Sequence, residues 1–218
     1  MPLPRRPRRA ARCVALRWRG PLNTREEPRP AMTDTQIFEP EGRAIPFVDE
    51  GDGPVKLVLV QERGLAADVL GVVAHYLAEE AGFHVLRIGH RADGEATVDE
   101  AVEDVLAVID QVGIGDTWIG GHGFGGTVAR AFAAAHPDRA DGLLTLGVED
   151  VDVPVAPAIP VLIIQGTDDT VTPAENAERL RASVPDRASI KTIAGDHLFP
   201  MTHPIETAVV IEEYLDWD

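Results

Sequence analysis

The hexapeptide Gly121–Gly126 (GHGFGG) is the feature that most restricts how this chain can fold. An apolar segment, residues 116–120, runs into it, and a helical pattern, residues 127–133, follows it. Because glycine adopts backbone conformations that side chains resist, the pattern predicts a sharp strand–turn–helix with Gly123 at its apex. An ordinary glycine-rich turn of a doubly wound fold accounts for the hexapeptide equally well.

Short apolar runs alternate with helical patterns from residue 44 onward, which predicts an α/β fold with a mostly parallel sheet flanked by helices. Residues 44–49 are expected to add an antiparallel edge strand. The proline-rich connector between residues 146 and 161 leaves no room for a cap domain. The expected strands are 55–60, 84–88, 117–120, 142–146, 161–165 and 189–193, and the expected helices are 68–81, 98–112, 124–136, 173–184 and 204–215.

Two helix starts carry the capping-box pattern, in which a threonine is followed three residues later by a glutamate. One pairs Thr97 with Glu100, and the other pairs Thr172 with Glu175. In a capping box the threonine hydroxyl accepts a backbone N–H of the first turn, and the glutamate returns the bond to the threonine N–H. The pattern therefore predicts helices that begin just after Thr97 and Thr172.

Residues 1–31 differ from the rest of the chain in composition. They hold nine arginines against Glu26 and Glu27, together with several prolines, and they show no periodic apolar face. This composition is typical of disorder, and because a globular pattern begins at Met32, we expect that Met32 is the biological start and that residues 1–31 are an upstream extension, either disordered or not translated. Residues 32–218 are expected to form one domain.

The charge of the folded part excludes several classes of partner. The whole chain carries a formal charge of −16, and removing the +7 of residues 1–31 leaves −23 on residues 32–218. A surface this acidic repels nucleic acid. The chain has no apolar run of about 18 residues, so no membrane contact is expected, and the cytoplasm is the expected location. Cys13, the only cysteine, lies outside the expected domain.

Beyond the hexapeptide, three further segments resemble the α/β-hydrolase superfamily, and the resemblance covers residues 44–218. Residues 136–139 leading into 142–144 are similar to its helix-to-strand junction, and Asp169 lies three residues after Gly166, as its catalytic acid does. The tripeptide Gly195-Asp196-His197, with Pro204 and a closing helix behind it, resembles its histidine turn. The family is then expected to supply a strand–turn–helix of the G-x-S-x-G type, in which Gly123 takes the serine position.

The resemblance implies a role for each site residue. His197 would be the catalytic base and Asp169 its orienting acid, while Gly123 offers no hydroxyl nucleophile. The only two serines of the chain, Ser183 and Ser189, flank a distant turn and cannot substitute. Gln61 and His122 are expected to line the pocket.

The second implied element is the oxyanion hole. Phe124 would supply one backbone N–H, and Glu62 and Arg63 lie in the loop that supplies the other. A carboxylate there would oppose a developing oxyanion, so we expect Glu62 either to face solvent or to be neutralised by Arg63. The space vacated at Gly123 is expected to have room for a water molecule.

Three functions are compatible with these residues. The first is a pseudoenzyme that binds a small apolar or carbonyl-bearing molecule, with weak or no hydrolysis. The second is an enzyme in which the His197–Asp169 dyad acts as a general base without a covalent acyl intermediate. The third is a protein-interaction role on the acidic surface. We expect no cofactor and no metal, and the sequence leaves the oligomeric state open.

Overall fold

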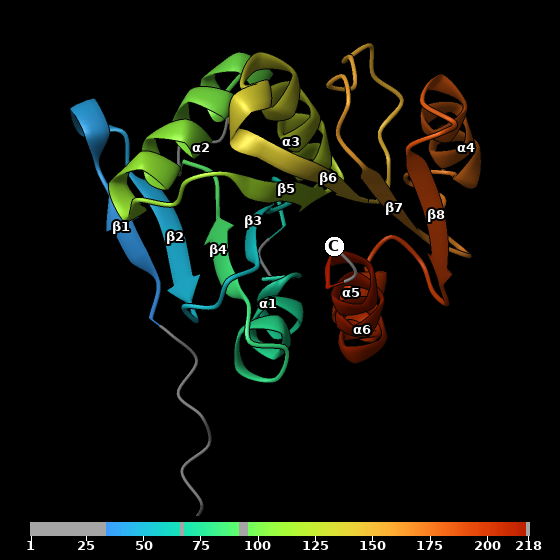
Figure 1. The fold of residues 1–218 in the computed structure, drawn as a ribbon, viewed down its shortest axis with the longest axis horizontal. Coiled ribbons are helices and arrows are strands. Elements are labelled where there is room, and N and C mark those ends of the chain that lie inside the picture. Colours follow the sequence, from blue (N-terminus) through green and yellow to red (C-terminus); the bar gives the residue numbers. More distant parts are fainter. Residues whose placement is uncertain (1–33, 66–67, 92–95, 217–218) are drawn as a thin grey trace, which may run out of the picture. The chain divides into compact units, whose positions relative to one another are not determined.

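The computed structural model describes residues 34–65, 68–91 and 96–216. The expected extension, residues 1–31, lies outside these ranges. Within the described residues, eight strands form a single sheet in the order β1-β2-β4-β3-β5-β6-β7-β8 (Figure 1). No helix in the described ranges is both long enough and apolar enough to cross a membrane.

The sheet is parallel from β4 to β8, as expected, and antiparallel at the side where the chain enters it. The segment expected as the edge strand forms β2, which pairs with β4 on one side and with an additional strand, β1, on the other. The expected edge position of this segment was therefore wrong, since β1 occupies the edge. A strand as short as β1 shows no period-2 pattern in the sequence, so it was not predicted. The strands are β1 (Gln36–Phe38), β2 (Ile45–Glu50), β3 (Lys56–Val60), β4 (His84–Ile88), β5 (Thr117–His122), β6 (Ala140–Leu146), β7 (Val161–Gly166) and β8 (Ala188–Ile193).

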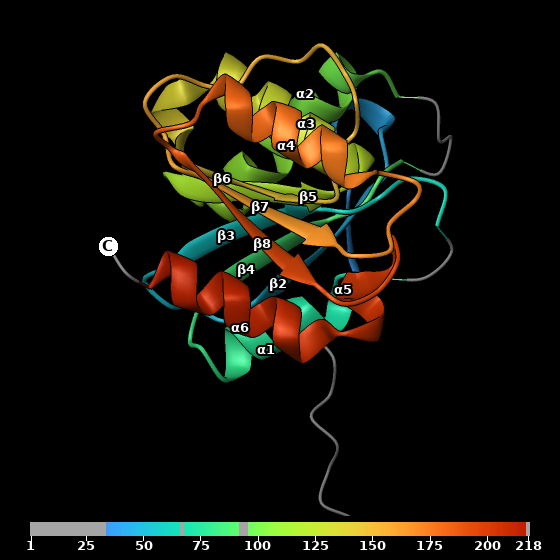
Figure 2. The ribbon, with the colours of Figure 1, turned by 90° about the vertical axis from the view of Figure 1, so that its right-hand side faces the viewer.

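Helices cover both faces of this sheet. Helices α2, α3 and α4 lie on one face, and α1, α5 and α6 lie on the other (Figures 1 and 2). Each face buries its own apolar cluster, and this burial is the main stabilising term of the fold. The helices are α1 (Gly71–Glu79), α2 (Val98–Val112), α3 (Phe124–Ala135), α4 (Ala174–Ser183), α5 (Phe199–Thr202) and α6 (Pro204–Leu215), with 3-10 turns at Pro40–Gly42 and Pro137–Arg139.

The two predicted capping boxes have different outcomes. Thr97 caps α2 as expected, with both bonds to Glu100 present. The second prediction was wrong, since Pro173 is the N-cap of α4 and makes no side-chain cap bond. The hydroxyl of Thr172 donates to the carboxylate of Asp169 instead. A hydrogen bond to an ionised, buried carboxylate is stronger than a neutral cap bond, so the hydroxyl of Thr172 binds Asp169, three residues earlier in the chain.

The connector between β6 and β7 contains no helix, which confirms the expectation of no cap domain within the described part of the chain. Side chains from the C-terminal half of the chain bind the backbone of this connector. Asn176 of α4 donates to the carbonyl of Val148 over 2.8 Å, and Arg187 donates to the carbonyl of Ala156 over 3.1 Å. The carboxyl ends of β3, β5 and β7 are therefore left uncovered by any inserted domain.

Candidate functional site

Gly123 lies at the apex of the strand–turn–helix, between the end of β5 and the start of α3. Its φ and ψ angles are 51° and −114°, a conformation that L side chains rarely adopt. A Cβ added there would overlap Oε2 of Glu62 and would lie 3.4 Å from Nε2 of His197. The expected turn is thus present, but its apex points at a carboxylate and an imidazole from two other segments.

The structure brings Asp169 and His197 into direct contact. Nδ1 of His197 donates to Oδ2 of Asp169 over 3.0 Å, and the Asp169 side chain is fully buried. The other carboxylate oxygen accepts the N–H groups of Val171 and Thr172 at 2.9 and 2.8 Å. These bonds fix the carboxylate so that it can hold the imidazole with Nε2 facing Gly123.

Gly147, which the sequence analysis did not single out, makes room for this pair. Its φ is +67°, and a Cβ there would lie 2.6 Å from Oγ1 of Thr172 and 3.5 Å from Cε1 of His197. Only glycine satisfies both the backbone conformation and the space. The signal in the sequence is a glycine directly after the apolar run of β6.

Of the two expectations for Glu62, that it faces solvent or is neutralised by Arg63, the first was wrong, because the side chain turns inward. The N–H of Phe124 donates to Oε2 of Glu62 over 2.8 Å, and the N–H of Arg63 donates to Oε1 over 3.0 Å. Oε2 also lies 3.7 Å from Nε2 of His197. The carboxylate therefore fills the space that we expected a water molecule to occupy, and it engages both N–H groups expected to form the oxyanion hole.

The guanidinium group of Arg63 stacks on the ring of Phe124, 3.7 Å from the ring centroid. The attraction between a cation and an aromatic face accounts for this position. Arg63 thus contacts Glu62 through its backbone N–H, and its side chain contributes to the wall above Phe124.

His197 lies between two carboxylates. Burial alone lowers the pKa of His197, but its bonds to Glu62 and Asp169 outweigh this and raise the pKa above its ordinary value. Burial raises the pKa of Glu62, but the contacts with His197 and the Phe124 N–H outweigh it and lower the pKa. For Asp169, burial also raises the pKa, and the hydroxyl and N–H of Thr172 lower it overall. The site therefore favours an imidazolium between two ionised carboxylates.

His122 lies behind the site and contacts the backbone of His197. It is completely buried, and its Nε2 donates to the carbonyl of His197 over 2.8 Å. Burial, with the nearby charge of His197, lowers the pKa of His122 to about 4, so it is neutral at pH 7. His122 therefore positions the loop of His197, and it is not among the residues that line the cavity beside the site.

A cavity of about 500 Å³ lies beside the site, and Gln61, Glu62 and Arg63 contribute to its wall. His90 lines the same cavity and donates from Nε2 to the carbonyl of Gln61 over 2.7 Å. The remaining wall is formed by apolar, polar and charged residues, namely Thr35, Pro46, Phe47, Val48, Gly64, Leu65, Asp68, Arg87, Gly89 and Arg91.

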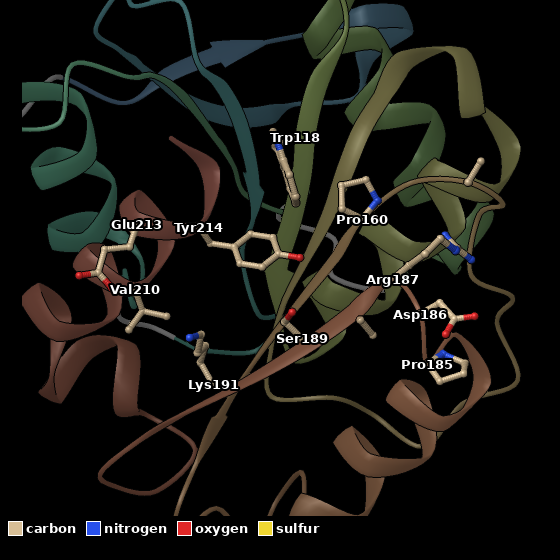
Figure 3. A pocket seen from close by; sticks show the side chains of 12 residues that line it. Trp118, Pro160, Pro185, Asp186, Arg187, Ser189, Lys191, Val210, Glu213 and Tyr214 are labelled. Atoms are coloured by element: carbon tan, nitrogen blue, oxygen red, sulfur yellow. The ribbon is translucent and has the colours of Figure 1, made fainter. Parts of the chain in front are cut away.

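The hydroxyl groups of Thr127, Ser183 and Ser189 do not reach the turn at Gly123 as free groups. Thr127, in the first turn of α3, donates to Glu149 over 2.6 Å, and Ser183 donates to the carbonyl of Leu180 over 2.7 Å. Ser189 lines a separate groove of about 1090 Å³ beside α6 (Figure 3). That larger groove contains Trp118, Lys191 and Tyr214 but none of the residues that surround Gly123.

Glu62, His122 and His197 form the one cluster in the described ranges with metal-ligand chemistry, their ligand atoms lying within 4.8 Å of one another. Convergent lone pairs are needed for a metal site. The two imidazole rings are instead stacked, with centroids 4.3 Å apart and planes inclined by 32°. Since Nε2 of His122 is also engaged by the carbonyl of His197, the arrangement fits a metal poorly.

Comparisons with known proteins place this geometry in context. Residues 70–198 match the family described as the alpha/beta hydrolase family. Epoxide hydrolase B of Mycobacterium tuberculosis is 34% identical over 77 residues, which cover 31% of this chain and 22% of that protein. The match therefore spans less than a quarter of that relative.

Solved structures with the same fold include two hydrolases. A thermophilic esterase from Thermogutta terrifontis has a TM-score of 0.71 and 18% identity, covering 84% of this chain and 98% of its own. A predicted CIB-like hydrolase from Thermoplasma acidophilum has a TM-score of 0.70 and 15% identity, covering 84% of this chain and 97% of its own. At such low identity these likenesses concern the fold alone.

Proposed function

Since the chain belongs to the alpha/beta hydrolase family, we propose that it hydrolyses a small molecule without a serine nucleophile, using His197 and Asp169 to activate water. Position 123, where the resemblance calls for the attacking serine, is glycine. The imidazole would take a proton from water, and the buried carboxylate would stabilise the imidazolium that forms.

The hydrogen bond between Asp169 and His197, 3.0 Å long, is the observation that carries this proposal. A histidine held by a buried acid, with its second nitrogen turned toward the turn at Gly123, has the geometry that general-base catalysis requires, and it can accept a proton at pH values above its raised pKa, where the imidazole is neutral. General-base catalysis contributes about 10²–10⁴-fold to a rate, which is sufficient for an activated substrate. The names of similar proteins include an esterase and an epoxide hydrolase, so esters and epoxides are the first substrates to test.

A second candidate is ligand binding without turnover, as in a pseudoenzyme. One observation favours it, because Glu62 engages the N–H groups of Phe124 and Arg63 and leaves neither of these two donors free for a substrate carbonyl. Under this alternative, replacing His197 would leave ligand affinity almost unchanged.

The test compares wild-type protein with His197→Ala and Asp169→Asn on a panel of small esters and epoxides. His203→Ala serves as the matched control, since His203 lies in the same segment but bonds to Thr202. We expect that a fluorophosphonate probe does not label the protein. We also expect that turnover is lost in both site variants and kept in the control. Stoichiometric labelling, or turnover that survives His197→Ala, would overturn the proposal. Ligand binding in the absence of any turnover would establish the second candidate instead.

A further inference from the structure

The carboxylate of Glu62 takes the place that the side chain of residue 123 would occupy. A Cβ built on Gly123 overlaps Oε2 of Glu62, so the carboxylate oxygen lies where a nucleophile on the turn would project. The same oxygen lies 3.7 Å from Nε2 of His197. Glu62 reaches this point from the loop after β3, a different segment from the turn itself.

We propose that Glu62 is the nucleophile of this site and that the substrate is a small alkyl electrophile, a saturated carbon bearing a leaving group. This inference rests on the proposed function, because it requires His197 and Asp169 to activate the water of the second step. Carboxylates form covalent intermediates in enzymes when they are ionised and held in position. Both conditions hold for Glu62.

The two backbone N–H groups that bind Glu62 hold it as a fixed anion. Arg63 donates to Oε1 and Phe124 to Oε2, at 3.0 and 2.8 Å, and the side chain is 16% exposed. Burial disfavours the ionised form, but the contact with His197 and the bond from the Phe124 N–H outweigh burial and lower the pKa of Glu62. The carboxylate is therefore ready to attack without losing a proton.

These contacts also explain why the substrate carbon is saturated. A carbonyl substrate needs donors for its developing oxyanion, and both donors already bind the oxygens of Glu62. Attack on a saturated carbon generates no oxyanion on the substrate. The charge develops later, on the Glu62 carbonyl itself, when water attacks the ester, and there the same N–H groups are already in place.

The reaction proceeds in two balanced steps. In the first, an oxygen of Glu62 forms a bond to the substrate carbon while the bond to the leaving group breaks, and a halide leaves with the electron pair. In the second, His197 takes a proton from water as the hydroxide adds to the carbonyl carbon of the Glu62 ester. The bond between that carbon and the alkoxide oxygen then breaks, the imidazolium returns its proton to the alkoxide, and the new carboxyl group releases its proton to solvent. The carboxylate is regenerated, and the net products are an alcohol, a halide and a proton.

The cavity beside Glu62 offers a place for such a substrate. Its volume of about 500 Å³ suits a small molecule, and Pro46, Phe47, Val48 and Leu65 supply apolar wall. An alkyl chain packed there would present its terminal carbon to the carboxylate.

The experiment uses a primary alkyl bromide, whose leaving group needs no proton. With His197→Gln we expect the alkyl ester to accumulate on the peptide that contains Glu62, because water activation is lost while alkylation remains. With Glu62→Gln we expect neither an ester nor turnover. Glu149→Gln is the matched control, since Glu149 bonds to Thr127 of α3 and not to His197. Equal thermal midpoints of the variants would verify that each is folded.

A single turnover in water labelled with heavy oxygen separates this inference from the proposed function. We expect the first alcohol released to carry ordinary oxygen from Glu62, while the label enters the carboxylate. Labelled alcohol in the first turnover, with activity still dependent on His197, would overturn the role of Glu62 and leave the proposed function intact. Turnover independent of His197 would overturn the proposed function. Absence of both turnover and ester with the bromide would also overturn the inference.

Discussion

Thr172 donates a 2.5 Å hydrogen bond to Oδ2 of Asp169, the same oxygen that accepts Nδ1 of His197. The Thr172 hydroxyl lies 3.3 Å from that nitrogen, so it contacts both members of the pair. Because Asp169 is buried, its ionised form depends on such donors. Thr172 thereby acts as a positioning residue for His197.

Replacing Thr172 with valine tests this role. The hydroxyl is the largest contribution that lowers the pKa of Asp169 against the effect of burial, so we expect Thr172→Val to raise this pKa toward its ordinary value. Stability should fall by about 1–3 kcal/mol, the cost of leaving a buried acceptor without its donor. NMR titration of the aspartate carboxyl carbons and urea denaturation measure the two effects. Thr172→Ser should restore both, and an unchanged Asp169 pKa in Thr172→Val would contradict the assignment.

The interaction between Glu62 and His197 predicts a change in the titration of the imidazole. The contact with Glu62 is the largest contribution that raises the pKa of His197 against burial, so Glu62→Gln should lower that pKa. In the Glu62→Gln variant, the imidazole of His197 should therefore lose its proton at a lower pH than in the wild type. NMR titration of the histidine ring protons provides the measurement, with Glu149→Gln as the control. A His197 pKa identical in the variant and the wild type would show that the two groups are not coupled.

The turn at Gly123 predicts how serine chemistry can be introduced. Gly123→Ser alone should give little ester hydrolysis, because its Cβ would overlap Oε2 of Glu62 and the backbone conformation disfavours a side chain. Adding Glu62→Ala clears the carboxylate and frees the Phe124 N–H, so the double variant should exceed the single variant. A loss of one donor typically costs about 10²–10³-fold in kcat, and the gain should approach that range. Initial rates on an activated ester measure it, and equal rates in the two variants would refute the expectation.

The raised pKa of His197 predicts a pH dependence of stability. A group with a raised folded pKa stabilises the protein below its unfolded pKa of 6.5, and this contribution disappears as the pH rises through the folded value. The stability difference between wild type and His197→Gln should therefore be largest below pH 6.5 and shrink above it. The lowered pKa values of Asp169 and Glu62 set the acid limit, since their contributions decline as the pH falls through the folded values.

Urea denaturation at a series of pH values measures this difference. His203→Gln is the control, since His203 contacts neither carboxylate of the site in the described structure. A difference between wild type and His197→Gln that grows as the pH rises would contradict the assignment of the imidazolium.

Much of the framework was predictable because its signals are local. The apolar runs of β3 to β8 and the helices between them follow from periodicity, and the cap at Thr97 follows from residues within one helical turn. The order of the segments, with the spacing around Asp169 and His197, was sufficient to indicate the superfamily. The position of β1 at the edge of the sheet, outside β2, was not predictable, since a strand of three residues shows almost no sequence pattern.

The sequence by itself determined that residue 123 has no side chain and that an acid and a histidine follow β7 and β8. The tertiary structure alone decided what fills the vacated position. Whether Glu62 faces solvent or turns inward depends on the N–H of Phe124, at the start of α3, which meets the loop of Glu62 and Arg63 only in the folded chain. At Thr172 the outcome also differs from the capping pattern, because its hydroxyl donates to Asp169, three residues earlier in the chain, which the fold buries against His197.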